Sequence, residues 1–270
     1  MSQPPPIVLS IAGFDPSSGA GITADIKTIA ALGCYGITAV TALTIQSTAG
    51  VRRVIPVEPE LLTDSLEELI SDVKVSAVHI GMLGTVSTVS TVAGFLRQAR
   101  PPNVVLDPIL VSSSGSRLLD PRGVELLTRE LMPLADIITP NIDESAALTG
   151  LEVKNPGQMA AAAERLHEMG VEAVVITGGH LDPATDIVSI RGQAIQTFHG
   201  EHLQSTNTHG TGCAFSTALA CYLALGKELA AAVASAKTYV TEAIRSSYSI
   251  GKGGGPVNHM HAQRDVSGKQ

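Results

Sequence analysis

Short runs of β-branched and aliphatic residues alternate along the chain with longer segments rich in Ala and Leu. The short runs have the length and composition of buried strands, and the longer segments repeat apolar residues at helical spacing. We predict strands at 7–11, 37–43, 77–80, 104–106, 136–138, 173–176 and 187–190. We predict helices at 21–32, 59–72, 86–99, 121–131, 143–149, 156–169, 213–225 and 228–246.

This alternation predicts the fold class. Strands that alternate with helices are typical of βαβ units, in which helices cover both faces of a mostly parallel sheet. Hydrophobic residues make up 44% of the chain but aromatic residues only 3%, so the core must consist of Ala, Val, Ile and Leu, which suit such a sheet. No segment resembles a linker and no internal repeat is visible. We therefore predict a single α/β domain over residues 1–270, with flexible tails at 1–6 and 262–270.

Charge and cysteine content narrow the partners and the compartment. The formal net charge is −7 and there is no basic run, which argues against a nucleic-acid partner. No stretch of about 18 apolar residues occurs, and the N-terminus lacks the regions of a signal peptide, so we expect no membrane association. The three cysteines, Cys34, Cys213 and Cys221, form no paired motif, which favours a reducing, cytoplasmic setting.

Six of the predicted strands end at residues that can bind a ligand or react. Open α/β sheets bind ligands at the carboxyl ends of their strands, so this edge is the predicted site. The alternative is that loops are rich in Gly, Pro, Asn and Asp whatever their function. The six segments are Gly13–Asp15, Gln46, Gly81–Gly84, Asp107–Pro108, Pro140–Asn141 and Thr177–His180.

A glycine-rich turn, Asn207–Cys213, runs directly into an apolar helix. The backbone N–H groups of Gly210, Thr211 and Gly212 at this helix N-terminus predict an anion hole suited to a phosphoryl group. Cys213 falls in the first turn, where it could accept a proton or act as a nucleophile. The helix dipole lowers the pKa of such a thiol and a bound phosphate raises it, so the net direction stays open. The alternative is a flexible turn before a small buried residue; no Walker sequence occurs.

Three other polar positions fit phosphoryl transfer to a small ring. Asn141 and Glu144 lie three apart at a predicted helix start, where the carboxylate could hold Mg²⁺ through water; an acidic helix cap is the alternative. Asp25 falls among apolar residues and must be paired, hydrogen-bonded or solvent-facing. Gln46 offers the donor and the acceptor that an aminopyrimidine edge requires, or it is simply a solvent-facing polar residue.

Seven segments, in order, resemble the hydroxymethylpyrimidine/phosphomethylpyrimidine kinases of the ribokinase-like class. The resemblance covers residues 7 to 261 and implies a three-layer αβα sandwich that forms a homodimer. It also implies ATP-dependent phosphorylation of 4-amino-5-hydroxymethyl-2-methylpyrimidine to its monophosphate and then to its diphosphate, in thiamine biosynthesis. The segments are Ser10–Thr28, Thr41–Val51, Ile80–Gly84, Leu106–Gly115, Thr139–Glu144, Thr208–Cys213 and Gly251–His259.

The same resemblance implies roles for single residues. Gln46 matches the pyrimidine-binding position of the family, and Gly13, Asp25 and Met82 match other positions that line this pocket. The stretch from Gly210 to Cys213 matches the anion hole and, at Cys213, the catalytic position. The implied cofactors are ATP and Mg²⁺, with Glu144 holding the metal through water. The positions implied for the nucleotide and metal region are Asp107, Asn141, Glu144, Thr177 and Gly179.

The chain departs from the family pattern at three positions. Ser18 stands where the family often has Gly, Phe14 where Ser is common, and Thr177 where the family often has Lys. The missing Lys removes a cation near the expected phosphates, for which Lys237 could compensate. A pyridoxine/pyridoxal kinase on the same scaffold is the main alternative function. A non-catalytic ligand-binding protein is the other, and the intact anion hole with Cys213 argues against it.

Overall fold

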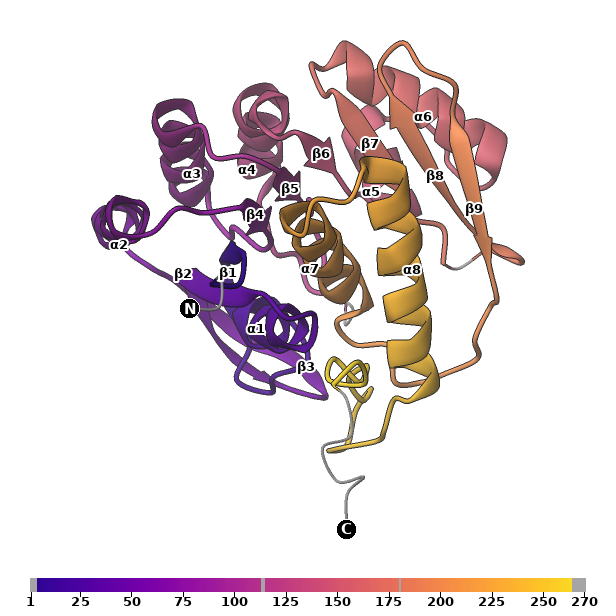
Figure 1. Cartoon of the computed structure of the whole chain (residues 1–270), viewed down its shortest axis with the longest axis horizontal. Coiled ribbons are helices and arrows are strands. Elements are labelled where there is room, and N and C mark those ends of the chain that lie inside the picture. Colours follow the sequence, from indigo (N-terminus) through magenta and orange to yellow (C-terminus); the bar gives the residue numbers. More distant parts are fainter. Residues whose placement is uncertain (1–3, 113–114, 180, 264–270) are drawn as a thin grey trace.

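One nine-stranded sheet forms the centre of the computed structural model, which describes residues 4–112, 115–179 and 181–263. The strand order across the sheet is β3-β2-β1-β4-β5-β6-β7-β8-β9 (Figure 1). The strands are β1 (Ile7–Phe14), β2 (Tyr35–Ser47), β3 (Gly50–Pro56), β4 (Ala77–Ile80), β5 (Val104–Leu106), β6 (Ile137–Ile138), β7 (Ala173–Ile176), β8 (Ala184–Ile190) and β9 (Gln196–Gly200).

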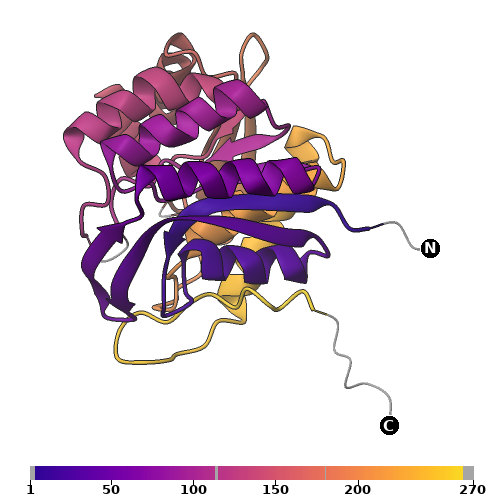
Figure 2. The ribbon, with the colours of Figure 1, turned by 90° about the vertical axis from the view of Figure 1, so that its left-hand side faces the viewer.

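The central strands β2, β1, β4, β5, β6 and β7 run parallel to one another. Antiparallel strands complete both edges, β3 beside β2 and β8 with β9 beside β7. Because the parallel strands end at one edge of the sheet, the segments that follow them meet there. The β2–β3 hairpin projects at this edge, on the side where β1 ends (Figure 2).

Helices cover both faces of the sheet, so the chain forms three layers (Figures 1 and 2). Alternate strand residues face opposite layers: Leu9 belongs to the apolar cluster that also holds residues of α2, α3 and α6, whereas Val8 belongs to the cluster with residues of α1, α7 and α8. This is the predicted αβα sandwich of the ribokinase-like class. The helices are α1 (Gly21–Ala31), α2 (Pro59–Asp72), α3 (Val86–Ala99), α4 (Pro121–Leu126), α5 (Ile142–Thr149), α6 (Pro156–Glu168), α7 (Thr211–Ala224) and α8 (Leu229–Arg245).

Most of the predicted elements are confirmed within two or three residues at each end. The helix predicted at 121–131 is wrong in one respect, because α4 ends at Leu126 and the chain continues in a wider turn, Leu127–Leu131, and then a tighter one, Met132–Leu134. Strands β3 and β9 were not predicted. Both are antiparallel edge strands that alternate between half-buried and exposed positions, so they lack the apolar runs of the central strands.

The structure also bears on the ends of the chain and on membranes. Of the two predicted tails, Pro6 already accepts a hydrogen bond from the N–H of Tyr35 at 2.9 Å, and most of the other tail positions lie outside the described residues. Within the described part of the chain, no helix combines the length and the apolar character needed to span a bilayer.

Candidate active site

The carboxyl edge of the sheet brings the predicted site residues together. Gly13 and Met82, from the ends of β1 and β4, are neighbours, because a Cβ added at Gly13 would lie 3.2 Å from the Met82 methyl carbon. A side chain at Gly13 would displace the end of the Met82 side chain, so glycine leaves room for Met82 to pack against the strand. The other edge positions are Gln46 in β2, Asp107 after β5, Asn141 after β6, and Thr177 and Gly179 after β7.

Helix α7 begins beside these strand ends with a tightly constrained turn. Gly210 has φ +84°, and a Cβ there would lie 1.8 Å from the carbonyl oxygen of Gly19, so only glycine fits. The N–H of Thr211 donates to Thr208, at 3.2 Å. No protein acceptor takes the N–H of Gly212 or of Cys213 in the described part of the chain. The N–H of Gly210 likewise has no acceptor among the described residues, so these groups at the positive end of the helix dipole are suited to bind an anion; of the three predicted donors, only that of Thr211 is used within the turn.

The Cys213 thiol is held in its protonated form. Cys213 is half-buried, and its desolvation together with the nearby carboxylates of Asp107 and Asp25 raises the pKa of the thiol well above the usual value. A hydrogen bond from the backbone of Gly21 acts in the opposite direction but is the weaker effect. The direction that the sequence left open is therefore upward, before any phosphate binds.

A fully buried network of polar side chains lies beneath the first turns of α7. One carboxylate oxygen of Asp25 accepts a hydrogen bond from Ser10 at 2.7 Å, and the other accepts one from Thr217 at 2.8 Å. His79 of β4 lies 3.3 Å from the same carboxylate. Burial alone would lower the pKa of His79, but the negative charges of Asp25 and Asp107 raise it above the usual value. Asp25 reaches the ligand pocket only through the residues that it binds, because it is itself inaccessible.

Ser216 extends this network to the phosphate side. His79 Nε2 lies 2.9 Å from the Ser216 hydroxyl, which in turn lies 3.1 Å from a carboxylate oxygen of Asp107. The same oxygen would lie 3.8 Å from a Cβ at Gly212, so Asp107 adjoins the anion-binding turn. Burial raises the pKa of Asp107 to about 6, with His79 opposing the shift.

Asn141 and Glu144 form the cap of α5. The Asn141 side chain accepts the N–H of Glu144 at 2.9 Å, and the Glu144 carboxylate accepts the N–H of Asn141 at 3.0 Å. Burial and repulsion from Asp107 raise the pKa of Glu144 to about 8. The helix-cap alternative is thus present in the structure, and yet a simple exposed cap would not hold a carboxyl group so far from its ordinary pKa. Glu144 is thus both a member of the helix cap and a buried carboxyl group with a raised pKa.

Asp15 organises the loop between β1 and α1. Its carboxylate accepts hydrogen bonds from the N–H groups of Ser17 at 2.8 Å and Ala20 at 2.9 Å. His209, in the turn before α7, contacts the same carboxylate at 3.1 Å and approaches the Gln46 side chain at 3.4 Å. These hydrogen bonds outweigh burial and lower the pKa of Asp15, so it is ionised. The predicted pyrimidine-binding Gln46 therefore belongs to a cluster that joins β1, β2 and α7.

The segment that follows α8 returns to the same loops. His259 contacts the carbonyl oxygen of Gly19 at 3.2 Å, and burial lowers its pKa to about 4, so the ring is neutral and donates there. The N–H groups of Lys252 and Gly253 donate to the Thr48 hydroxyl at the tip of the β2–β3 hairpin, each at 3.2 Å. Figure 2 shows this segment passing below the hairpin. The start of the segment Gly251–His259, one of the seven that resemble the family, thus holds the tip of the β2–β3 hairpin.

The residues predicted for the nucleotide lie after β7. Thr177 donates its N–H to Pro140 at 3.0 Å and so is tied to the end of β6, while Gly179 is exposed. Lys237 of α8 forms an ion pair with Asp186 at 2.6 Å, and the other oxygen of Asp186 accepts the N–H of Gly178 at 2.9 Å. A cation therefore does stand behind the Thr177 loop, held by Asp186. His180, named with this loop, lies outside the described residues.

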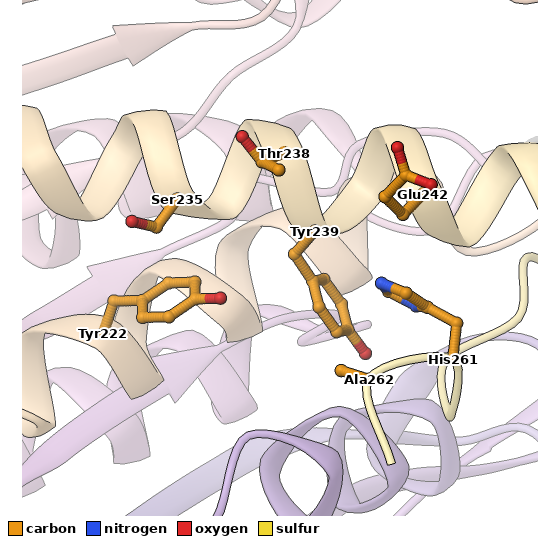
Figure 3. A pocket seen from close by; sticks show the side chains of 7 residues that line it. All are labelled: Tyr222, Ser235, Thr238, Tyr239, Glu242, His261 and Ala262. Carbon is orange, nitrogen blue, oxygen red and sulfur yellow. The ribbon is translucent and has the colours of Figure 1, made fainter. Parts of the chain in front are cut away.

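A separate shallow pocket lies between α7, α8 and the segment after α8, with a volume of about 280 Å³ (Figure 3). Tyr222 lines it from the carboxyl half of α7, whereas the anion-binding turn is at the amino end of that helix. Tyr239 and His261 stack there with their ring centroids 4.7 Å apart. No residue of the predicted site lines this pocket, so we do not assign it to the reaction.

The sequence placed Asp15 in a strand-end segment of the predicted site but gave it no individual role, and it assigned no role to His79 or His209. Asp15 follows β1 directly and His209 lies inside the glycine-rich turn, so both had a positional signal. His79 had none, because an apolar strand shows nothing of the side chains that face it from other elements.

Comparison with known proteins places the chain among kinases. The family described as phosphomethylpyrimidine kinase matches residues 15–258. A hydroxymethylpyrimidine/phosphomethylpyrimidine kinase of Rhizobium meliloti is 42% identical over 260 residues, covering 94% of this chain and 97% of the relative. The thiamine biosynthesis bifunctional protein ThiED of Geobacter sulfurreducens is 44% identical over 96% of this chain, which spans only 53% of that longer protein.

A solved structure with the same fold is the ADP complex of Bacillus subtilis pyridoxal kinase. It is 34% identical, with a TM-score of 0.88, and the superposition covers 94% of this chain and 97% of the pyridoxal kinase.

Proposed function

The chain belongs to the phosphomethylpyrimidine kinase family, and on that premise we propose that it phosphorylates 4-amino-5-hydroxymethyl-2-methylpyrimidine and then the resulting monophosphate, in thiamine biosynthesis, with ATP as phosphoryl donor. The observation that carries the proposal is the start of α7. The N–H groups of Gly212 and Cys213, which have no acceptor among the described residues, lie near Asp107, at the edge of the sheet where Gln46 and Met82 also lie.

The first turn of α7 would bind the phosphoryl group during transfer. Phosphoryl transfer needs mainly positioning and charge stabilisation, and fixed N–H donors supply both. Gly212 has no side chain between these donors and the ligand, so phosphate oxygens can approach the backbone closely. The Asp15 loop closes the other side of the turn, because Gly19 touches Gly210 and His209 touches Asp15.

We propose Mg²⁺ as the metal of the reaction, and the residues present fit it. Asp107 and Glu144 repel one another, and both have raised pKa values, so a dication between them and the phosphates would relieve that repulsion. Among the described residues no group of three or more His, Cys, Asp or Glu side chains is arranged as a metal cage. Nucleotide oxygens and waters would therefore complete the shell, with Asn141 capping the helix that presents Glu144. Bound Mg²⁺ supplies charge neutralisation of the phosphates.

Cys213 is the proposed proton acceptor for the hydroxymethyl group. A base works best when its pKa is near the working pH, and the raised pKa of this thiol leaves little thiolate at neutral pH. We therefore assign the larger part of the rate to the anion-binding turn and the smaller part to Cys213. Asp25, the buried partner of this region, acts on the pocket through Thr217 and Ser10.

ATP would lie over the loops after β6 and β7, at Thr177 and Gly179. The family often has a lysine at the position of Thr177. Here Lys237 provides a positive charge indirectly, through Asp186. It neutralises Asp186, and Asp186 fixes the N–H of Gly178. Lys237 is thereby a positioning residue for the loop and not a direct phosphate ligand in this conformation.

Two further proposals concern assembly and compartment. Leu43, Ile45 and Ile55 are exposed on one face of the β2–β3 hairpin, and apolar patches of this kind often mark interaction surfaces. A homodimer that covers this face would account for them. The three cysteines are all free thiols, which suits a reducing cytoplasm.

Pyridoxal phosphorylation is the second candidate, and the likeness to the Bacillus subtilis pyridoxal kinase favours it. One assay separates the two. Purified protein with ATP and Mg²⁺ is incubated with hydroxymethylpyrimidine, its monophosphate, pyridoxal and pyridoxine, and the products are quantified by mass spectrometry. We expect the two pyrimidines to be the better substrates. A Gly212→Val variant, whose side chain would cover the anion-binding turn, is the control for contaminating kinases. If none of the four compounds is phosphorylated, the kinase proposal is wrong.

A further inference from the structure

Gln46, the proposed pyrimidine-binding residue, is held between two polar neighbours. Its amide oxygen lies 3.2 Å from the Thr44 hydroxyl, and its amide nitrogen lies 3.4 Å from His209 Nε2. The two ends of a glutamine amide have nearly the same shape, so the neighbouring hydrogen bonds decide which end points where. Both neighbours have other partners, and those partners fix the position of their protons.

Thr44 has a single hydroxyl proton. The Thr44 oxygen also lies 3.0 Å from the backbone carbonyl of Phe14, which can only accept. The proton therefore goes to Phe14, and the Thr44 oxygen is left as an acceptor. An acceptor at this position requires the NH₂ end of the Gln46 amide to face Thr44.

His209 leads to the same orientation from the other side. Its Nε2 lies 3.1 Å from the carboxylate of Asp15, which also accepts the N–H groups of Ser17 and Ala20. Burial opposes ionisation of this carboxylate, but the hydrogen bonds from His209, Ser17 and Ala20 outweigh it and lower the pKa of Asp15, so the carboxylate is ionised. A carboxylate can only accept, so Nε2 must carry a proton. A protonated Nε2 cannot accept from an NH₂ group, so the end of the Gln46 amide that suits it is the oxygen, which can share with Asp15 the single Nε2 proton.

We infer that Thr44 and His209 are positioning residues that fix the Gln46 amide with its NH₂ group toward Thr44 and its oxygen toward His209. This inference rests on the proposed function, and it determines which way round the pyrimidine binds. One N–H and one lone pair of Gln46 remain for the ligand. The ring nitrogen would accept on the Thr44 side, and the exocyclic amine would donate on the His209 side.

This orientation places the reacting group where the phosphoryl group is bound. In the substrate the order along the ring edge is ring nitrogen, amine-bearing carbon, and then the carbon that carries the hydroxymethyl group. With the amine beside His209, the hydroxymethyl group extends toward the turn from Gly210 to Cys213, which follows His209 in the chain. With the amide reversed, the same ring would bind with its hydroxymethyl group directed away from α7.

The test compares binding with turnover in Thr44→Val, which keeps the shape of the side chain and removes the hydroxyl, against the matched control Thr44→Ser. A freely rotating amide still binds the ring, but in part the wrong way round. We expect the Kd of hydroxymethylpyrimidine to change by less than about threefold and the single-turnover rate at saturation to fall about fivefold, the size of one lost hydrogen bond. Thr44→Ser should restore the rate.

His209→Leu removes the other neighbour and should give the same split between binding and rate, which keeps the test available if Thr44→Val does not fold. An unchanged rate in Thr44→Val, a parallel loss of binding and rate, or a Thr44→Ser variant as impaired as Thr44→Val would each overturn the inference. Wild-type protein that does not phosphorylate the pyrimidine at all would instead overturn the proposed function.

Discussion

Two histidine–aspartate pairs stand on either side of the start of α7, and they differ in what surrounds them. His79 and Asp25 lie 3.3 Å apart, and both side chains are 0% exposed. His209 and Asp15 lie 3.1 Å apart, with the side chains 16% and 4% exposed. The chemistry of the contact is the same, but one pair is enclosed by Ser10, Ser216 and Thr217 and the other faces the proposed substrate pocket.

The difference shows that the position of an aspartate in the sequence does not reveal whether its carboxylate faces the ligand or buried partners. The resemblance to the family placed Asp25 at the pocket, whereas its carboxylate is used entirely by buried partners. Asp15 received no role, although it orders the loop and contacts the histidine next to Gln46. The fully buried pair supports the anion-binding turn from below, and the pair whose histidine is partly exposed can respond to the ligand.

The largest effect should come from removing the histidine of the buried pair. His79→Leu leaves Asp25 and Asp107 in the interior without a cation, and breaking a buried pair costs about 3–5 kcal/mol of unfolding free energy. The matched variant His209→Leu should lose about 1 kcal/mol or less, because its pair is nearer to water. Urea unfolding of both variants at pH 7 measures the comparison. Equal losses would mean that the two pairs do not differ in the way proposed.

The variant Glu144→Gln tests how the raised pKa of Glu144, on the phosphate side of the buried network, affects the stability of the protein. The folded-state pKa of about 8 lies above the ordinary value of 4.5, so folding holds a proton that the unfolded chain releases. The stability that the protonated Glu144 contributes to the fold is fully present below about pH 4.5 and is lost as the pH rises toward 8. In the absence of nucleotide, the Glu144→Gln variant should therefore be more stable than wild type at pH 8 by about 3 kcal/mol, and it should differ little near pH 4.5. The figure follows from about 1.4 kcal/mol per pKa unit, less the part of the shift that is shared with Asp107.

Although Glu144→Gln should stabilise the fold at pH 8, it should weaken the use of Mg²⁺-ATP. The amide cannot supply charge to a hydrated Mg²⁺, so the KM for Mg²⁺-ATP should rise more than the Kd of the pyrimidine. Equal changes in the two constants, with no gain in stability at pH 8, would reduce Glu144 to a helix cap.

Cys213 lies between the two regions and tests which one controls the chemistry. Loss of a general base costs about 10²–10⁴-fold in rate, and the raised thiol pKa leads us to expect about 10²-fold for Cys213→Ala, with normal stability and substrate binding. Cys213→Asp should recover part of that loss. Alkylation of the wild-type thiol should accelerate about tenfold per pH unit between pH 7 and 9, because the thiolate is the reactive form. A single-turnover rate for Cys213→Ala within about threefold of wild type would leave the reaction to the anion-binding turn alone.

The sequence predicted the sheet and the edge that carries the site, because both depend on local patterns. Apolar runs such as those of β4 and β5 mark strands buried on both faces, and the residues after them are placed by strand direction alone. The buried network could not be predicted, since Asp25, His79 and Thr217 come together only through packing of α1, β4 and α7. The pKa of Cys213 could not be predicted for the same reason: its direction depends on Asp107 and Asp25 as three-dimensional neighbours.

The smallest expected effect concerns the pocket side of the comparison. Gln46→Leu leaves the amine and the ring nitrogen of hydroxymethylpyrimidine without partners, so binding should weaken by about 1–3 kcal/mol. Pyridoxal has no such amine and should lose less, so the ratio of the two Kd values should shift toward pyridoxal. The His209–Asp15 pair should keep its contact, because the ionisation of Asp15 does not depend on the Gln46 side chain. The unfolding free energy should therefore stay within about 0.5 kcal/mol of wild type, the usual range for a change away from the core. Isothermal titration with the two ligands, together with urea unfolding, measures both parts. An unchanged ratio would remove Gln46 from substrate selection, and a large loss of stability would show that this pair, like the buried one, supports the fold.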